Sequence, residues 1–312
     1  MRARFAADLA RLWPEGEDGG ERLGLAVSGG PDSMALLLLA AAALPGRVEA
    51  ATVDHGLRAE SAGEAAMVAR VCAGLDVPHQ TLTVTVAPGN LQHRARAARY
   101  AALAEWAASR GLSALATGHQ LDDQAETLVM RLNRGSGLAG LAGVRARGVA
   151  PGSELALLRP LLGWSRAKLA DIVAAAGLEA AQDASNVDER FDRVRIRKAL
   201  GQANWLDAEG LARSAALLAE AEGFVNEAIA ELWQARVRQS PEGWRFTPVA
   251  SDFAATEIAR RIIVELGGEA RRSEAAELVT RLRRGENASL GGTLVRVRGE
   301  EWVFEKEPPR SS

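Results

Sequence analysis

Cysteine and histidine are scarce in this sequence, and their scarcity limits the metal and disulfide chemistry open to it. The 312 residues include one cysteine, Cys72, and four scattered histidines. One thiol can form neither a disulfide framework within the chain nor a four-thiolate metal site. We therefore expect no disulfide scaffold and no structural zinc site.

The chain also lacks a long apolar run and a large excess of one charge. Residues 1–12 are short for a signal peptide and carry Arg2, Arg4 and Arg11. The net charge of −2 leaves nucleic-acid binding open, because a local basic patch can hide in a balanced total. With 47% hydrophobic and 25% charged residues, the composition is typical of a soluble globular protein. We expect a cytoplasmic protein with two domains and no membrane contact.

A glycine turn at residues 28–33 follows an apolar run and opens an alanine- and leucine-rich run that reaches Leu44. This order predicts a buried strand, a tight loop and a helix. Gly29 and Gly30 let backbone N–H groups approach a ligand closely, and Pro31 fits the first helical turn. The amides at such a helix start can bind phosphate. No Gly-Lys-Ser/Thr sequence follows, so the turn is not a Walker loop.

Asp32 is the unusual residue of this turn. A carboxylate beside phosphate oxygens is repulsive unless a cation such as Mg²⁺ lies between them. The alternative is an ordinary strand-to-helix turn capped by Ser28 or Asp32. An aspartate at this position therefore favours a nucleotide-binding site that also binds a cation.

Strand-like and helix-like runs alternate through the first two thirds of the chain. They predict an α/β fold with an open parallel five-stranded sheet covered by helices on both faces. From about residue 206 the pattern becomes mainly helical, and it ends in a β-hairpin over residues 289–305. We therefore predict two domains, 1–205 and 206–312. The expected strands are residues 23–27, 47–53, 78–86, 112–117 and 155–162.

Polar residues follow three of these expected strands. They are the glycine turn, the pair Asp54-His55 and the pair Gly118-His119. In open parallel sheets, ligands bind beyond the carboxyl ends of the strands. We therefore expect the three groups to meet in one crevice.

Three carboxylates, Asp122, Asp123 and Glu126, follow His119 at the start of an expected helix. Their spacings place them on one helix face, where the helix dipole favours negative charge. A single Asp at a helix start is usually a cap, but three acids in five residues exceed what capping requires. The cluster could hold a metal ion, an ammonium group or both.

Basic residues recur in three places. Arg96 and Arg99 can point the same way on a helix, or form a solvated face. Residues 182–197 begin as a turn and end as a basic run, which is either a site element or a charged linker. The third group forms a solvated face or a surface for RNA phosphate. It consists of Arg260, Arg261, Arg271, Arg272, Arg281, Arg283, Arg284, Arg296 and Arg298.

Four stretches together resemble the tRNA(Ile)-lysidine synthases of the ATP pyrophosphatase, or PP-loop, superfamily. The glycine turn alone is typical of the superfamily, and the combination is more specific. The resemblance runs from about residue 23 to residue 200 and is weaker in the tail. The stretches are residues 28–33, residues 53–58, the run from Ala95-Arg96 and Arg99-Tyr100 through 122–127 to 134–137, and residues 183–186 with Ile196-Arg197.

The resemblance implies an adenine nucleotide alpha hydrolase-like fold and a two-step ligation that uses ATP and Mg²⁺. The 2-oxo group of the wobble cytidine in a CAU-anticodon isoleucine tRNA is adenylated, and pyrophosphate leaves. The ε-amine of free lysine then displaces AMP to form lysidine. Residues 1–205 would be the ATP-binding catalytic domain and residues 206–312 a domain that contacts tRNA. A homodimer stays open.

The resemblance also implies roles for individual residues. Ser28, Gly29, Gly30, Pro31 and Ser33 would hold the ATP phosphates, Asp32 and Asp123 a metal ion, and His55 and His119 the nucleotide pocket. Asp122, Asp123 and Glu126 would select the lysine cation and take its proton, since neutral lysine is rare at pH 7. Arg96, Arg99 and Arg197 would contact phosphate groups or the tRNA backbone, and Asn186 would contact a substrate.

Two features depart from the family pattern. Val194 stands where an Asn is expected in the Arg-Asn-x-Ile-Arg element. The chain also stops where longer members carry one more C-terminal domain, so we expect fewer elements to grip tRNA.

Three other functions are weighed against the ligase. A tRNA 2-thiolation enzyme of the same superfamily activates a similar base carbonyl, but it resembles proteins that use cysteines or an iron–sulfur cluster. An ammonia-using synthetase would need an amide-hydrolysing partner and no basic tail. A non-catalytic tRNA-binding protein with a relic ATP loop would not need Asp32 or the acidic cluster.

Overall fold

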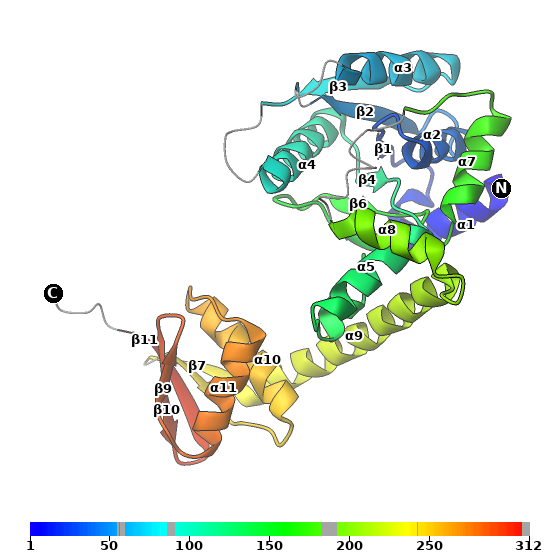
Figure 1. The fold of residues 1–312 in the computed structure, drawn as a ribbon. Helices are drawn as coiled ribbons and strands as arrows, with labels where there is room; N and C mark the ends of the chain where they lie inside the picture. The colour runs from blue at the N-terminus through cyan, green and yellow to red at the C-terminus, as the bar shows by residue number, and fades with distance from the viewer. Residues whose placement is uncertain (55, 57–59, 86–90, 182–191, 242, 308–312) are drawn as a thin grey trace. The chain divides into compact units, whose positions relative to one another are not determined.

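The computed structural model describes residues 1–312 except 55, 57–59, 86–90, 182–191, 242 and 308–312 (Figure 1). Its contacts divide the chain into two compact units, Met1–Ala219 and Glu220–Ser312. The division falls inside the long helix α9 (Ala208–Arg236), whose first turns bury Ala212 and Ala215 in the first unit. The change of composition near residue 205 comes just before the start of α9, whereas the contacts divide the chain within that helix. The domain limit at residue 205 therefore stays a prediction.

The first unit is built on a six-stranded sheet with strand order β3-β2-β1-β4-β6-β5. Five of its strands are parallel, as the alternating pattern predicted, while β5 pairs antiparallel with β6 at the edge. With three residues, β5 is too short to show the alternation of apolar and polar side chains that predicts a strand. The sequence therefore did not predict this sixth strand. The strands are β1 (Leu23–Ala26), β2 (Val48–Asp54), β3 (His79–Thr83), β4 (Ala114–Thr117), β5 (Arg147–Val149) and β6 (Ala156–Leu158).

Helices cover both faces of this sheet, again as predicted (Figure 1). On one face α1, α2, α3 and α7 form a core with Leu25 and Met34, and on the other α4 packs through Trp106 against Leu115. The side chains of Ala114 and Leu115 enter opposite cores because successive strand residues face opposite sides. The helices are α1 (Arg2–Leu12), α2 (Pro31–Ala43), α3 (Glu60–Gly74), α4 (Leu91–Arg110), α5 (Leu121–Asn133), α6 (Leu138–Leu141), α7 (Arg166–Ala175) and α8 (Asp192–Gln202).

The second unit contains more strand than the sequence predicted. The expected terminal hairpin is confirmed as β10 and β11, but it belongs to a five-stranded antiparallel sheet of order β7-β8-β11-β10-β9. Its core joins α10 and α11 to the sheet, and Phe246 packs edge-on against Trp302 with ring centroids 5.6 Å apart. The elements after α9 are β7 (Val237–Ser240), β8 (Gly243–Phe246), α10 (Asp252–Glu265), α11 (Arg272–Arg283), β9 (Ala288–Leu290), β10 (Thr293–Arg298) and β11 (Glu301–Lys306).

Candidate active site

The glycine turn joins β1 to α2 and is held by its two serines. The Ser28 amide donates to Ser33 Oγ (3.1 Å), and Ser33 Oγ donates to the Gly30 carbonyl (2.9 Å). Gly29 has a φ of +89°, a conformation that side chains other than glycine rarely adopt. No side chain caps the first turn of α2, which starts at Pro31, so its amides stay available to an anion.

The loop after β4 lies directly against this turn. A Cβ added at Gly118 would lie 3.0 Å from the carbonyl carbon and oxygen of Asp32 and 3.0 Å from the Ser33 nitrogen. A side chain at this position would therefore force the two loops apart. The acidic helix α5 begins shortly after, at Leu121, so the turn and the acidic cluster share one edge of the sheet.

Asp32 is a partly buried residue whose Oδ1 is buried without a described hydrogen-bond partner. Burial, helped by the negative charge of Asp123, raises its pKa to about 6, and the guanidinium groups of Arg166 and Arg197 oppose that rise. A buried orphan oxygen is costly unless a ligand completes it. The donor set fits Mg²⁺, which binds proteins through one or two carboxylates together with substrate phosphates.

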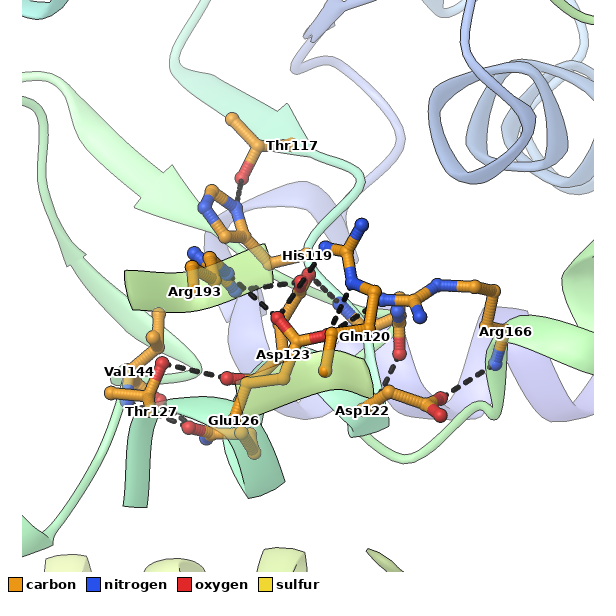
Figure 2. Close-up of polar contacts among 12 residues, drawn as sticks. Thr117, His119, Gln120, Asp122, Asp123, Glu126, Thr127, Val144, Arg166 and Arg193 are labelled. Carbon is orange, nitrogen blue, oxygen red and sulfur yellow. Dashed lines mark hydrogen bonds and ion pairs between the residues drawn. The ribbon is translucent and has the colours of Figure 1, made fainter. Parts of the chain in front are cut away.

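The carboxylates at the start of α5 serve different partners (Figure 2). Asp123 Oδ2 accepts from the Gln120 amide (3.0 Å) in a capping box, and its Oδ1 accepts from Arg193 Nη2 (2.7 Å). Burial raises the pKa of Asp123, and Arg193 opposes that effect. Asp122 Oδ2 accepts from the Arg166 amide (2.8 Å), and no described residue donates to its Oδ1. Asp122 therefore keeps one oxygen open to a cation.

Glu126 is 1% exposed and surrounded by three guanidinium groups. Its Oε1 lies 2.7 Å from Arg197 Nε and 3.1 Å from Arg166 Nη2, and its Oε2 lies 2.7 Å from Arg193 Nε. Although burial opposes ionisation, the hydrogen bonds from Arg197 and Arg193 lower the pKa of Glu126. Glu126 therefore holds the three arginine side chains in position, and both of its carboxylate oxygens already accept hydrogen bonds.

Sequence reasoning did not single out Arg166 and Arg193. Arg193 lies four residues before Arg197, so both project from one face of α8 toward α5, and this spacing was a usable signal. Arg166 is the first residue of α7, and nothing local distinguishes it. Within the 122–127 motif, Gln124 has a structural role, since its amide exchanges two hydrogen bonds with the Val144 backbone (2.6 and 2.7 Å).

His119 shares a 2.8 Å hydrogen bond with Thr117 Oγ1 at the end of β4. Burial, followed by the charges of Arg159, Arg193, Arg96 and Arg99, lowers its pKa to about 3. The imidazole is therefore neutral at physiological pH and can offer a hydrogen bond without adding charge. Two other predicted residues, His55 and Asn186, lie outside the described residues.

His119 should stay uncharged across the physiological range. Histidine NMR signals assigned with a His119→Gln variant should show no titration of this ring between pH 5 and 8, while the denatured chain titrates near its ordinary pKa of about 6.5. The unfolded state alone binds the proton between these pKa values, so this group makes stability fall as pH falls from about 6.5 toward 3. A folded-state transition near pH 6.5 would contradict the buried, arginine-lined environment.

Many arginines of the second unit are paired, so its basic character is weaker than the sequence indicates. Arg261 instead stacks over Trp233, 4.2 Å from the ring centroid. Among the described helices, none combines the length and apolar character needed to span a bilayer. The described arginines of this unit that pair with carboxylates are Arg238, Arg245, Arg260, Arg272, Arg281, Arg283 and Arg296.

Known proteins resemble this chain in sequence over most of its length. Residues 1–204 match a family model described as a PP-loop domain. The tRNA(Ile)-lysidine synthase of Novosphingobium aromaticivorans is 46% identical, over 99% of this chain and 95% of its own length. That of Zymomonas mobilis is 41% identical, over 93% of this chain and 89% of its own.

A solved structure shares the fold at much lower identity. The U34-tRNA thiolase NcsA from Methanococcus maripaludis, solved with its [4Fe-4S] cluster, matches with a TM-score of 0.56 and 15% identity, over 69% of this chain and 76% of its own. At that identity the match supports the fold alone. The family model matches residues 1–204, and the two relatives align with 99% and 93% of the chain. This chain therefore belongs to the tRNA(Ile)-lysidine synthase family of PP-loop ligases.

Proposed function

We propose that this chain joins free lysine to C2 of the wobble cytidine in a CAU-anticodon isoleucine tRNA. The observation that carries the proposal is the contact of Gly118 with Asp32 and Ser33. The start of α2, which we propose to bind phosphate, and Asp122, which has an open carboxylate oxygen, therefore lie at one edge of the sheet. A ligase needs both a triphosphate site and an amine site next to the same acceptor atom.

In the first step the 2-oxo oxygen of cytidine bonds to the α-phosphorus of ATP, and pyrophosphate leaves. The α2 amides and the turn serines would hold the phosphates, and Asp32 would hold Mg²⁺ through its unpartnered Oδ1. Asp123 would be the second ligand, sharing oxygens that already accept from the Gln120 amide and from Arg193. When bound, that ion neutralises phosphate charge. Arg197, fixed by Glu126, lies close enough to Asp32 to lower its pKa and is placed to contact a phosphate group.

In the second step the lysine ε-amine bonds to C2, and AMP leaves with the former carbonyl oxygen. The ammonium must first lose a proton, since only about one lysine in a thousand is neutral at pH 7. Asp122 is better placed than Glu126 to bind the ammonium and accept that proton, because Glu126 already bonds three arginines. Of the three carboxylates that the sequence suggested, we therefore propose Asp122 as the one that binds the lysine ammonium.

The direct test is incubation of the purified protein with ATP, Mg²⁺, labelled lysine and isoleucine tRNA carrying the CAU anticodon. Label should enter the tRNA, with AMP and pyrophosphate released in equal amounts. A tRNA with a different wobble base is the matched control. AMP release without incorporated lysine, or sulfur-dependent modification, would contradict the proposal.

Asp122→Asn should raise the KM for lysine about 10- to 100-fold, because a charge-assisted hydrogen bond to the ammonium is lost. Pyrophosphate release in the first step should change little, since Asp122 does not contact the glycine turn in this scheme. The exposed Asp171→Asn is a control of equal charge change. An unchanged lysine KM would remove Asp122 from the amine site.

Thiolation is less well supported by the structure. Cys72, the one cysteine, is fully buried in the sheet core, and burial raises its pKa to about 11. A thiol of this kind is a poor nucleophile and metal ligand.

Because the proposed reaction uses ATP, lysine and tRNA, we propose that the protein acts in the cytoplasm. Light scattering would decide between a monomer and the homodimer that the sequence left open.

A further inference from the structure

Arg159 is a buried cation that the reaction scheme above does not use. It follows β6 directly, is 9% exposed, and donates from Nη1 to the Arg145 carbonyl (2.6 Å). The Tyr100 hydroxyl accepts a further hydrogen bond from its guanidinium group, while Nε is buried and unpartnered. No carboxylate pairs with Arg159 among the residues that the structure describes.

The surroundings of Arg159 add positive charge. Arg96 stacks over the Tyr100 ring, 4.9 Å from its centroid, and neither Arg96 nor Arg99 pairs with a carboxylate in the described part of the chain. All three guanidinium groups lie near enough to His119 to act on its charge. We call Arg96, Arg99 and Arg159 the arginine cluster.

This arrangement contrasts with the arginines around Glu126, where a carboxylate balances the charge. A buried cation without a counter-ion costs several kcal/mol. Arginine presents a rigid fork of donors that suits phosphate oxygens. The unpartnered Nε of Arg159 therefore points to an anion that completes the cluster.

The position of the cluster separates it from the glycine turn. In the sheet, β6 is two strands from β1, with β4 between them. Neighbouring strands lie about 4.8 Å apart, so the end of β6, which Arg159 follows, is roughly 10 Å from the glycine turn that would hold the triphosphate. The arginine cluster and the phosphate-binding turn proposed at α2 are therefore separate positions along these strand ends.

We propose that the arginine cluster, with Arg159 at its buried end, binds a phosphate group of the RNA chain beside the target nucleotide. The inference rests on the proposed function and adds Arg159 to it as a substrate-binding residue. An ATP phosphate has the same chemistry, so the test separates the two sources.

The test uses Arg159→Gln in the full-length protein, with tRNA binding measured at several salt concentrations and ATP binding measured separately. We expect tRNA affinity to fall about 10-fold and the slope of log K against log salt to decrease by about 1, with ATP affinity unchanged. Arg70→Gln, an exposed arginine on α3, removes the same charge elsewhere and should change neither.

Stability separates binding from a purely structural role. Loss of an unbalanced buried cation should leave the melting temperature unchanged or higher, whereas a structural Arg159 would lower it and leave both affinities intact. If Arg159→Gln fails to fold, Arg159→Lys decides, because it keeps the charge but loses the fork and should still weaken tRNA binding several-fold.

The outcomes are distinct. Loss of ATP affinity alone would overturn the RNA assignment, and wild-type affinity for both ligands would overturn the phosphate site. Lysidine formation by the wild-type protein is scored in parallel, so a failure of this inference is distinguishable from a failure of the proposed function.

Discussion

Glu126→Ala should destabilise the first unit by about 3–5 kcal/mol, the usual effect of removing one partner from a buried ion pair. Glu126 is 1% exposed and bonds Arg166, Arg193 and Arg197, so its loss leaves three cations facing one another. In a unit of this size the melting temperature should fall by roughly 10 °C. Activity should be lost even at temperatures where the protein stays folded, because Arg197 is no longer positioned.

Two companion variants sharpen this test. Glu126→Gln keeps the shape of the side chain but not its charge, and it should recover part of the stability and none of the activity. Glu105→Ala, on the exposed surface of α4, should change stability by less than about 0.5 kcal/mol. A Glu126→Ala protein that melts within about 2 °C of the wild type would contradict the role of Glu126 as the centre of the arginines.

Asp32→Asn should abolish activity and at the same time stabilise the free protein at neutral pH. In the folded state the Asp32 pKa is about 6, against 3.8 ordinarily. The native state therefore holds the proton more tightly, and stability falls as pH rises from about 4 to 6. The full penalty above pH 6 is about 1–3 kcal/mol, and Asn removes it because it does not ionise.

Denaturant unfolding between pH 4 and 8 measures this effect. The difference between wild type and Asp32→Asn should be near zero at pH 4 and reach its maximum above pH 6. Asp171→Asn provides the control, and ATP with Mg²⁺ should stabilise the wild type more than Asp32→Asn. Activity of the variant should fall at least about 100-fold, as for loss of one preorganised electrostatic group. Parallel pH profiles, or retained activity, would exclude Asp32 from the site.

Local patterns were sufficient to predict the elements that form the edge of the sheet. The glycine turn, the acidic start of α5 and the alternation of strands and helices depend on residues a few positions apart. Such short-range patterns report directly on local conformation. The short strands β5, β7 and β8 were missed because their three or four residues carry no periodic signal and depend on pairing with a neighbour.

The sequence by itself determined the family, the fold class and the segments that carry the chemistry, because these depend on residue types at short spacings. Only the tertiary structure decided how the charges are shared. It assigned Glu126 to arginines from α7 and α8. Among the residues that the structure describes, it left an oxygen of Asp122 without a donor and Arg159 buried without a counter-ion. Electrostatic partners are chosen by distance in space, and residues 40 to 71 positions apart meet here only after the chain has folded.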